Sequence, residues 1–116
     1  FTFRHNAGWE HNNILLSLLS AREHLAGGFV STYADIVYEG AVVQKLVAAP
    51  EHIVLGCDTE WRRRYVGRSQ HPETDAEKLT AETGSEMHRE DTRGGYMEID
   101  TREDLALAAG WWESRP

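Results

Sequence analysis

The 116-residue sequence predicts an α/β fold, with a mostly parallel sheet and flanking helices. Three observations predict it. Runs rich in β-branched and aromatic residues alternate with stretches whose apolar residues recur every three or four positions. The run 52–58 is mostly apolar, as in a strand that is covered on both faces of its sheet. The connection between the first two predicted strands is long enough for a right-handed crossover.

The first predicted strand and helix precede a double-glycine break. Residues 1–4 alternate apolar and polar side chains, which predicts a short strand. The pair Asn12-Asn13 can cap the helix that follows, whose leucines and isoleucine recur at helical spacing. Gly27-Gly28 ends that helix, and residues 29–34 after it predict a second strand.

A second helix and a third strand complete this central part. Valines and leucines recur at three and four positions within 40–49, so we expect a helix there that Pro50 ends. The apolar run 52–58 then forms the third strand. This order predicts a central βαβαβ part within residues 1–82.

The remainder of the chain is more polar. Residues 61–68 are dense in arginines and aromatics, and 71–82 predict a loop with a short helix. Residues 83–95 contain three glycines and little apolar material. A short strand is expected at 96–100.

A final helix is predicted after residue 100. Thr101 can cap it, with Asp104 at the third following position. The spacing of the residues that follow predicts one face shared by Leu105, Ala108 and Trp112.

Composition limits the classes of function. The net charge of −7 argues against unaided binding to nucleic acid, which needs a basic surface. No apolar run approaches the ~20 residues that span a bilayer, so we expect no membrane partner. The single cysteine, Cys57, cannot form an internal disulfide, which fits a reducing compartment and predicts a cytoplasmic protein.

Two acids stand at the ends of predicted strands, Asp35 and Asp100. Parallel strands would bring their carboxyl ends to the same edge of the sheet, where ligands bind in open α/β folds. Paired carboxylates suit Mg²⁺, which fills its remaining positions with water and substrate phosphate. The alternative is that Asp35 only caps a helix and that Asp100 only favours a helix N-terminus.

The basic run 61–68 has three interpretations. Its arginines can hold phosphate or phosphonate oxygens. Trp61 and Tyr65 can face a ligand cation. The third interpretation is a solvated basic turn whose two aromatics pack on the core.

The six histidines show no metal-binding spacing among themselves, and each fits a surface or capping role. They are His5, His11, His24, His52, His71 and His88. Cys57 has no CxxC partner, so we expect it to be a small buried apolar residue.

An ordered set of short motifs resembles the sugar-nucleotidyltransferase-like family, of the phosphocholine cytidylyltransferase and 2-aminoethylphosphonate nucleotidyltransferase type. The matches cover most of the chain. In order they are Asn12-Asn13-Ile14, Ser17-Leu18, Tyr33–Tyr38, Asp58, Trp61-Arg62, Tyr65–Arg68, Ala76–Lys78, Gly94–Thr101 and Asp104-Leu105.

The resemblance implies a Rossmann-like nucleotide-diphospho-sugar transferase fold and the transfer of a nucleoside monophosphate, CMP above all. The implied partners are a nucleoside triphosphate and a small phosphorylated or phosphonate acceptor, and the reaction releases pyrophosphate. Asp35 and Asp100 are the implied catalytic residues, because they would hold Mg²⁺. Trp61 and Tyr96 are the implied contacts of an aminoethyl or choline head, and Arg62 and Lys78 those of phosphate.

Two features depart from the family pattern. The family opens with a glycine-rich loop, followed by a lysine, that holds the triphosphate, and this sequence has no counterpart. A second gap is expected near residues 83–85. We therefore expect a single partial domain over 1–116, with its C-terminal strand and helix in 85–116. A truncated non-catalytic remnant or partner-binding module of the same fold is the alternative, and a homodimer stays open.

Overall fold

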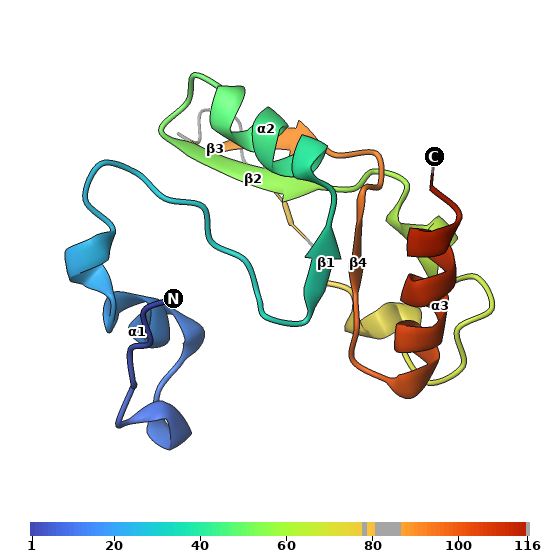
Figure 1. Cartoon of the computed structure of the whole chain (residues 1–116), viewed down its shortest axis with the longest axis horizontal. Helices are drawn as coiled ribbons and strands as arrows, with labels where there is room; N and C mark the ends of the chain where they lie inside the picture. The colour runs from blue at the N-terminus through green and yellow to red at the C-terminus, as the bar shows by residue number, and fades with distance from the viewer. Residues whose placement is uncertain (78, 81–86, 116) are drawn as a thin grey trace. The chain divides into compact units, whose positions relative to one another are not determined.

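The computed structural model describes residues 1–77, 79–80 and 87–115. The chain divides into two compact units, Phe1–Ser31 and Thr32–Pro116 (Figure 1). The first contains only short helices, and the second contains both sheets and the longer helices. The candidate site lies wholly in the second unit.

The first unit is built around helix α1, Ile14–Leu19, with 3-10 turns η1 (Trp9–His11) and η2 (Arg22–His24) on either side. The asparagine cap is confirmed, because the side chain of Asn13 accepts a hydrogen bond from the N–H of Leu16 at 3.2 Å. The strand predicted at residues 1–4 is wrong, since those residues have no regular structure. Apolar–polar alternation alone does not make a strand without a partner to pair with.

The first sheet of the second unit is antiparallel. Strand β1, Ile36–Tyr38, pairs with β4, Tyr96–Glu98, and Ile36 stands opposite Glu98. The strand predicted at 29–34 is therefore displaced, because the chain pairs only after Asp35. The position of the partner strand decides which residues of a β-prone stretch join a ladder.

The second sheet is parallel. Strand β2, Ile53–Cys57, pairs with β3, Met87–Asp91, in a register that sets Cys57 opposite Asp91. Helix α2, Gly40–Ala48, links β1 to β2 and packs on β2, with the side chain of Leu46 lying over Gly56 (Figure 1). The predictions of α2 and β2 are confirmed.

Strand β3 lies within 83–95, a segment for which the sequence predicts no helix or strand. Residues 87–91 form a strand, although four of the five carry polar side chains. Parallel pairing with β2 gives these residues backbone hydrogen bonds, which a pattern of polar side chains does not predict. Residues 83–86 of that segment lie outside the described part of the chain.

The architecture is mixed α/β with two small sheets, one parallel and one antiparallel. The expectation of a mostly parallel Rossmann-like sheet is thus met only in part. Within 1–82, the described helices and strands run α1, β1, α2, β2, so the first strand of the predicted βαβαβ part is wrong and its second strand is displaced. Among the described helices, none has the length and apolar content that crossing a membrane requires.

Three further helical elements surround the site. They are the 3-10 turns η3 (Trp61–Tyr65) and η4 (Glu73–Asp75) and helix α3 (Arg102–Glu113). The turn η4 confirms the short helix predicted within 71–82. The prediction of the α3 start is confirmed by a full capping box between Thr101 and Asp104. The predicted apolar face is wrong for Leu105 and Trp112, which are 58% and 55% exposed. The face that α3 buries instead runs through Asp104 and Ala108, because the buried partner of Asp104 sets the rotation of the helix.

Candidate functional site

The two acids predicted as metal ligands lie at the same end of the antiparallel sheet. Asp35 directly precedes β1, and Asp100 follows β4 by two residues. The backbone N–H of Ile99 donates to the carbonyl of Asp35 at 2.8 Å. Antiparallel pairing brings the start of one strand to the end of the other, so Asp35 comes beside the end of β4 for a different reason from the one expected.

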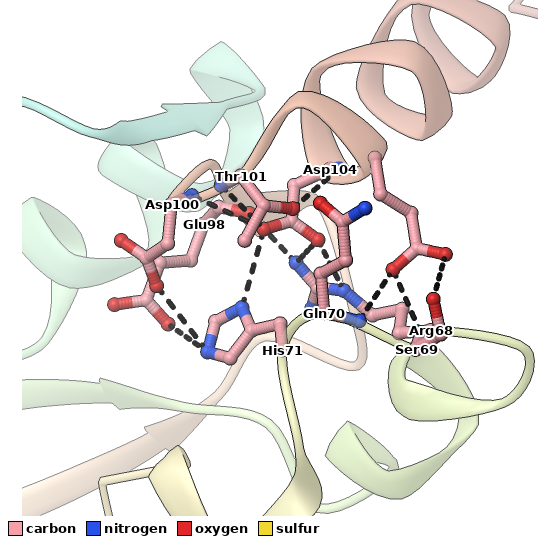
Figure 2. A network of polar contacts seen from close by, with 9 residues as sticks. Arg68, Ser69, Gln70, His71, Glu98, Asp100, Thr101 and Asp104 are labelled. Carbon is pink, nitrogen blue, oxygen red and sulfur yellow. Dashed lines mark hydrogen bonds and ion pairs between the residues drawn. The ribbon is translucent and has the colours of Figure 1, made fainter.

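A buried histidine lies between acids from β4 and from α3 (Figure 2). The His71 side chain is 3% exposed, and its Nε2 lies 3.2 Å from Asp100 Oδ2 and 4.0 Å from Glu98 Oε2. On the other side of the ring, Nδ1 lies 3.3 Å from Asp104 Oδ2. Nδ1 makes no hydrogen bond within the described part of the chain.

Asp104 is the fully buried anchor of this site. Its Oδ1 accepts from Arg68 Nε at 2.6 Å, and its Oδ2 accepts from the backbone N–H of Thr101 at 2.9 Å and of Asp100 at 3.2 Å. Burial acts to raise the pKa of Asp104, but the hydrogen bonds from Arg68, Thr101 and Asp100 together lower it to about 2. The carboxylate is therefore ionised at neutral pH.

The loop that carries His71 is fastened to the first turn of α3. Glu103 accepts from the N–H of Ser69 at 2.7 Å, from the N–H of Gln70 at 2.9 Å and from the Ser69 hydroxyl at 3.0 Å. The hydrogen bonds from the backbone of Gln70 and Ser69 lower the pKa of Glu103. Together with the Arg68–Asp104 pair, these bonds fix where the imidazole of His71 points.

Two arginines cover the free edge of β4. Arg64 donates to the carbonyl of Tyr96, and Arg68 donates to the carbonyl of Glu98 at 3.0 Å. Carbonyls two residues apart point to the same side of a strand, so the guanidinium groups replace a neighbouring strand there. This positions Glu98 beside His71.

The acids of the site repel one another. Burial and then the charge of Asp100 raise the pKa of Glu98, with Asp35 and Glu77 acting in the same direction and His71 opposing them. One ligand atom from each of His71, Glu98 and Asp100 lies within 4.8 Å of the other two. A divalent cation among these groups would offset their repulsion, and its ligands would be two carboxylates and one imidazole.

The other predicted site residues lie elsewhere. Arg62 places its guanidinium carbon 4.8 Å from the ring centre of Trp61 and donates to Glu73 at 2.6 Å. Tyr96 has Arg64 over its ring at 5.1 Å, and burial raises its pKa. Trp61 stacks edge-on against Tyr65 at 5.6 Å, and Tyr65 in turn lies 5.3 Å from His71. Lys78 lies outside the described residues.

Sequence reasoning missed His71, Glu98 and the part played by Arg68. His71 stands in a polar loop, and its distance along the chain from Asp100 resembles no ligand spacing. Glu98 could have been found from the sequence, because alternate residues of a strand share a face and Asp100, two positions later, is a predicted ligand. Arg68 appeared among the family-like motifs without a role.

Comparison with known proteins yields one distant relative. No family model matches the chain, and no solved structure matches it. The chain is 26% identical over 103 residues to the CTP:phosphoglutamine cytidylyltransferase of Campylobacter jejuni subsp. jejuni serotype O:2. The match covers 84% of this chain and 41% of that relative, so the chain spans less than half the length of the curated protein it matches. The similarity supports a cytidylyltransferase-like relationship at the coarse level, in line with the resemblance of the sequence motifs.

Proposed function

We propose that this chain is part of a metal-dependent nucleotidyltransferase that transfers a cytidylyl group from CTP to a small phosphorylated or phosphonate acceptor. The observation that carries the proposal is the cluster of His71, Glu98 and Asp100 at the end of β4, on the side of the sheet where Asp35 precedes β1 and its charge acts on Glu98. The similarity to a cytidylyltransferase supports the choice of reaction.

In the proposed reaction, an oxygen of the acceptor forms a bond to the α-phosphorus of CTP. The bond from the α-phosphorus to the oxygen that bridges to the β-phosphate breaks, and pyrophosphate leaves with that electron pair. Mg²⁺ would neutralise the phosphate charge when bound. Asp35 and Asp100 would hold it, and the hydrogen bond from the backbone N–H of Asp100 to Asp104 keeps Asp100 in place.

We extend the proposal to the acceptor by its chemical class. The relative's name gives phosphoglutamine as its substrate, and phosphocholine and 2-aminoethylphosphonate share a phosphorus-bound oxyanion and a nitrogen-containing end. Trp61 and Tyr96 are the proposed contacts of the nitrogen end, and Arg62 and Lys78 those of the oxyanion. Arg62 has to leave Glu73 to take that role, because Glu73 holds its Nε at 2.6 Å.

The test is pyrophosphate release by the full-length protein with each of the four common nucleoside triphosphates. Phosphoglutamine, phosphocholine, 2-aminoethylphosphonate and glucose 1-phosphate serve as acceptors. We expect release with CTP and one of the first three, and its loss when EDTA removes the metal. Absence of release with every pair of substrates would contradict the proposal and favour the non-catalytic binding module.

A further inference from the structure

The acidic site contains a nitrogen ligand that the proposed magnesium chemistry does not use. Mg²⁺ prefers oxygen ligands, whereas imidazole suits Zn²⁺ and other transition metals. His71 is 3% exposed, and it directs Nε2 toward Asp100 and Glu98 at 3.2 and 4.0 Å (Figure 2). A buried polar ring aimed at two carboxylates calls for an explanation beyond packing.

Ion pairing with Asp104 does not supply that explanation. Asp104 accepts from Arg68 with one oxygen and from two backbone N–H groups with the other. An ionised carboxylate has about four acceptor positions, and these donors take most of them. His71 Nδ1 consequently lies 3.3 Å from Asp104 Oδ2 without forming a hydrogen bond.

Within the described part of the chain, two carboxylates and one imidazole face one another on the other side of the ring. Arg68 neutralises Asp104 with its side chain but reaches Glu98 only at the backbone carbonyl. Glu98 and Asp100 are 32% and 41% exposed, so the site is open to an ion from solvent. Three protein ligands with a free position for water is the arrangement of open zinc sites, and imidazole and carboxylate are both zinc ligands.

We propose that His71 Nε2, Glu98 and Asp100 bind a divalent transition-metal cation, and that His71 makes this site prefer Zn²⁺ over Mg²⁺. Asp104 then acts as a positioning residue through its neighbours, because it holds the backbone N–H of Asp100 and the Arg68 side chain of the loop that leads to His71. The inference rests on the proposed function for the location of the metal site, but it does not require catalysis.

The test is calorimetric titration of the full-length, metal-free protein with Zn²⁺ and, separately, with Mg²⁺. His71→Asn keeps an amide near Asp104 but withdraws the ligand atom from Glu98 and Asp100. We expect this variant to bind Zn²⁺ at least about tenfold more weakly, as disturbed metal sites do, while its Mg²⁺ affinity changes less than about twofold. Asp100→Asn is expected to lower the affinity for both Zn²⁺ and Mg²⁺.

The chain offers a matched control in His88. Its ring nitrogens also lie between two carboxylates, 3.6 Å from Glu51 and 3.5 Å from Glu90, but its side chain is 39% exposed. His88→Asn should leave both affinities unchanged. Equal Zn²⁺ affinity of the wild type and His71→Asn, or an equal loss in both histidine variants, would overturn the inference.

Thermal unfolding separates a folding defect from the loss of a ligand. Zn²⁺ should raise the melting temperature of the wild type and of His88→Asn, but not that of a folded His71→Asn. If His71→Asn does not fold, Asp104→Asn supplies the readout, with an expected loss of about 10- to 100-fold in Zn²⁺ affinity. If the wild type binds Zn²⁺ no more tightly than Mg²⁺ but still releases pyrophosphate from CTP with Mg²⁺, this inference is wrong and the proposed function stands.

Discussion

In the second unit, acids lie at the ends of the strands in both sheets, but only those of the antiparallel sheet form the candidate metal site. At the parallel sheet, Asp58 follows β2 and Asp91 ends β3. Asp58 accepts from Arg64 at 2.8 Å and from the N–H of Glu60 at 2.9 Å. Asp91 accepts from the Thr59 hydroxyl at 2.8 Å, and this hydrogen bond, with those from the backbone of Arg93 and Thr59, lowers its pKa.

At the antiparallel sheet, no hydrogen-bond donor in the described part of the chain occupies the carboxylate of Glu98 or Asp100, although His71 Nε2 lies 3.2 Å from Asp100. Burial and the charge of Asp100 raise the pKa of Glu98, which is the opposite direction from Asp91. The comparison teaches that an acid at a strand end is not by itself a metal ligand. What distinguishes a site is whether donors from the protein already occupy the carboxylates.

The largest expected effect is on catalysis. Asp35→Ala and Asp100→Ala should each lower kcat/KM for CTP-dependent transfer by about 1000-fold, because each removes a group that holds the metal against the phosphates. Both variants should keep the wild-type melting temperature. Asp91→Ala is the control from the other sheet, and its turnover should stay near that of the wild type. Near-normal turnover in either site variant would remove that acid from the metal site.

The next effect is on stability, and it compares the two buried arginine–aspartate pairs. Asp104→Ala leaves the Arg68 side chain, which is 3% exposed, without its partner and should cost about 3–5 kcal/mol of unfolding free energy. Asp58→Ala should cost less, about 2 kcal/mol, since the Arg64 side chain is 17% exposed and can reach water. Urea titrations measure both. Equal costs would show that exposure of the arginine does not set the penalty.

Acid should reduce the stability that the Asp104 carboxylate contributes, beginning above pH 2. The pKa of Asp104 is lowered from 3.8 to about 2 in the folded chain, so its stabilisation is complete above pH 3.8 and is lost as the pH falls through 2. The melting temperature of the wild type should therefore drop by a few degrees more between pH 5 and pH 2 than that of Asp104→Asn. Parallel curves for the two proteins would contradict this linkage.

The smallest expected effect concerns the acceptor. Trp61→Ala should raise the KM of the acceptor about fivefold and leave the KM of CTP nearly unchanged, because a cation–π contact is worth about 1 kcal/mol at a partly exposed site. The guanidinium of Arg62 already covers one face of this ring, which limits the gain from a ligand cation. Equal changes in both KM values would exclude Trp61 as an acceptor contact.

The sequence by itself determined the elements whose causes are local. Thr101 and Asp104 form the predicted capping box, and Asn13 caps α1 as expected. Apolar spacing located α2 and β2. Capping and periodicity depend on residues within one or two turns, so they can be read without knowing the rest of the fold. Asp35 and Asp100 were also selected as a pair from sequence.

Tertiary structure decided what depends on distant partners. Strand β3 exists because β2 pairs with it, and β1 begins after Asp35 because β4 fixes its register. The face of α3 is set by the Arg68–Asp104 pair rather than by its leucines. His71 joins Glu98 and Asp100 only through a loop held by Glu103. Such contacts join residues roughly 30 to 60 positions apart, and no local pattern encodes which of them will meet.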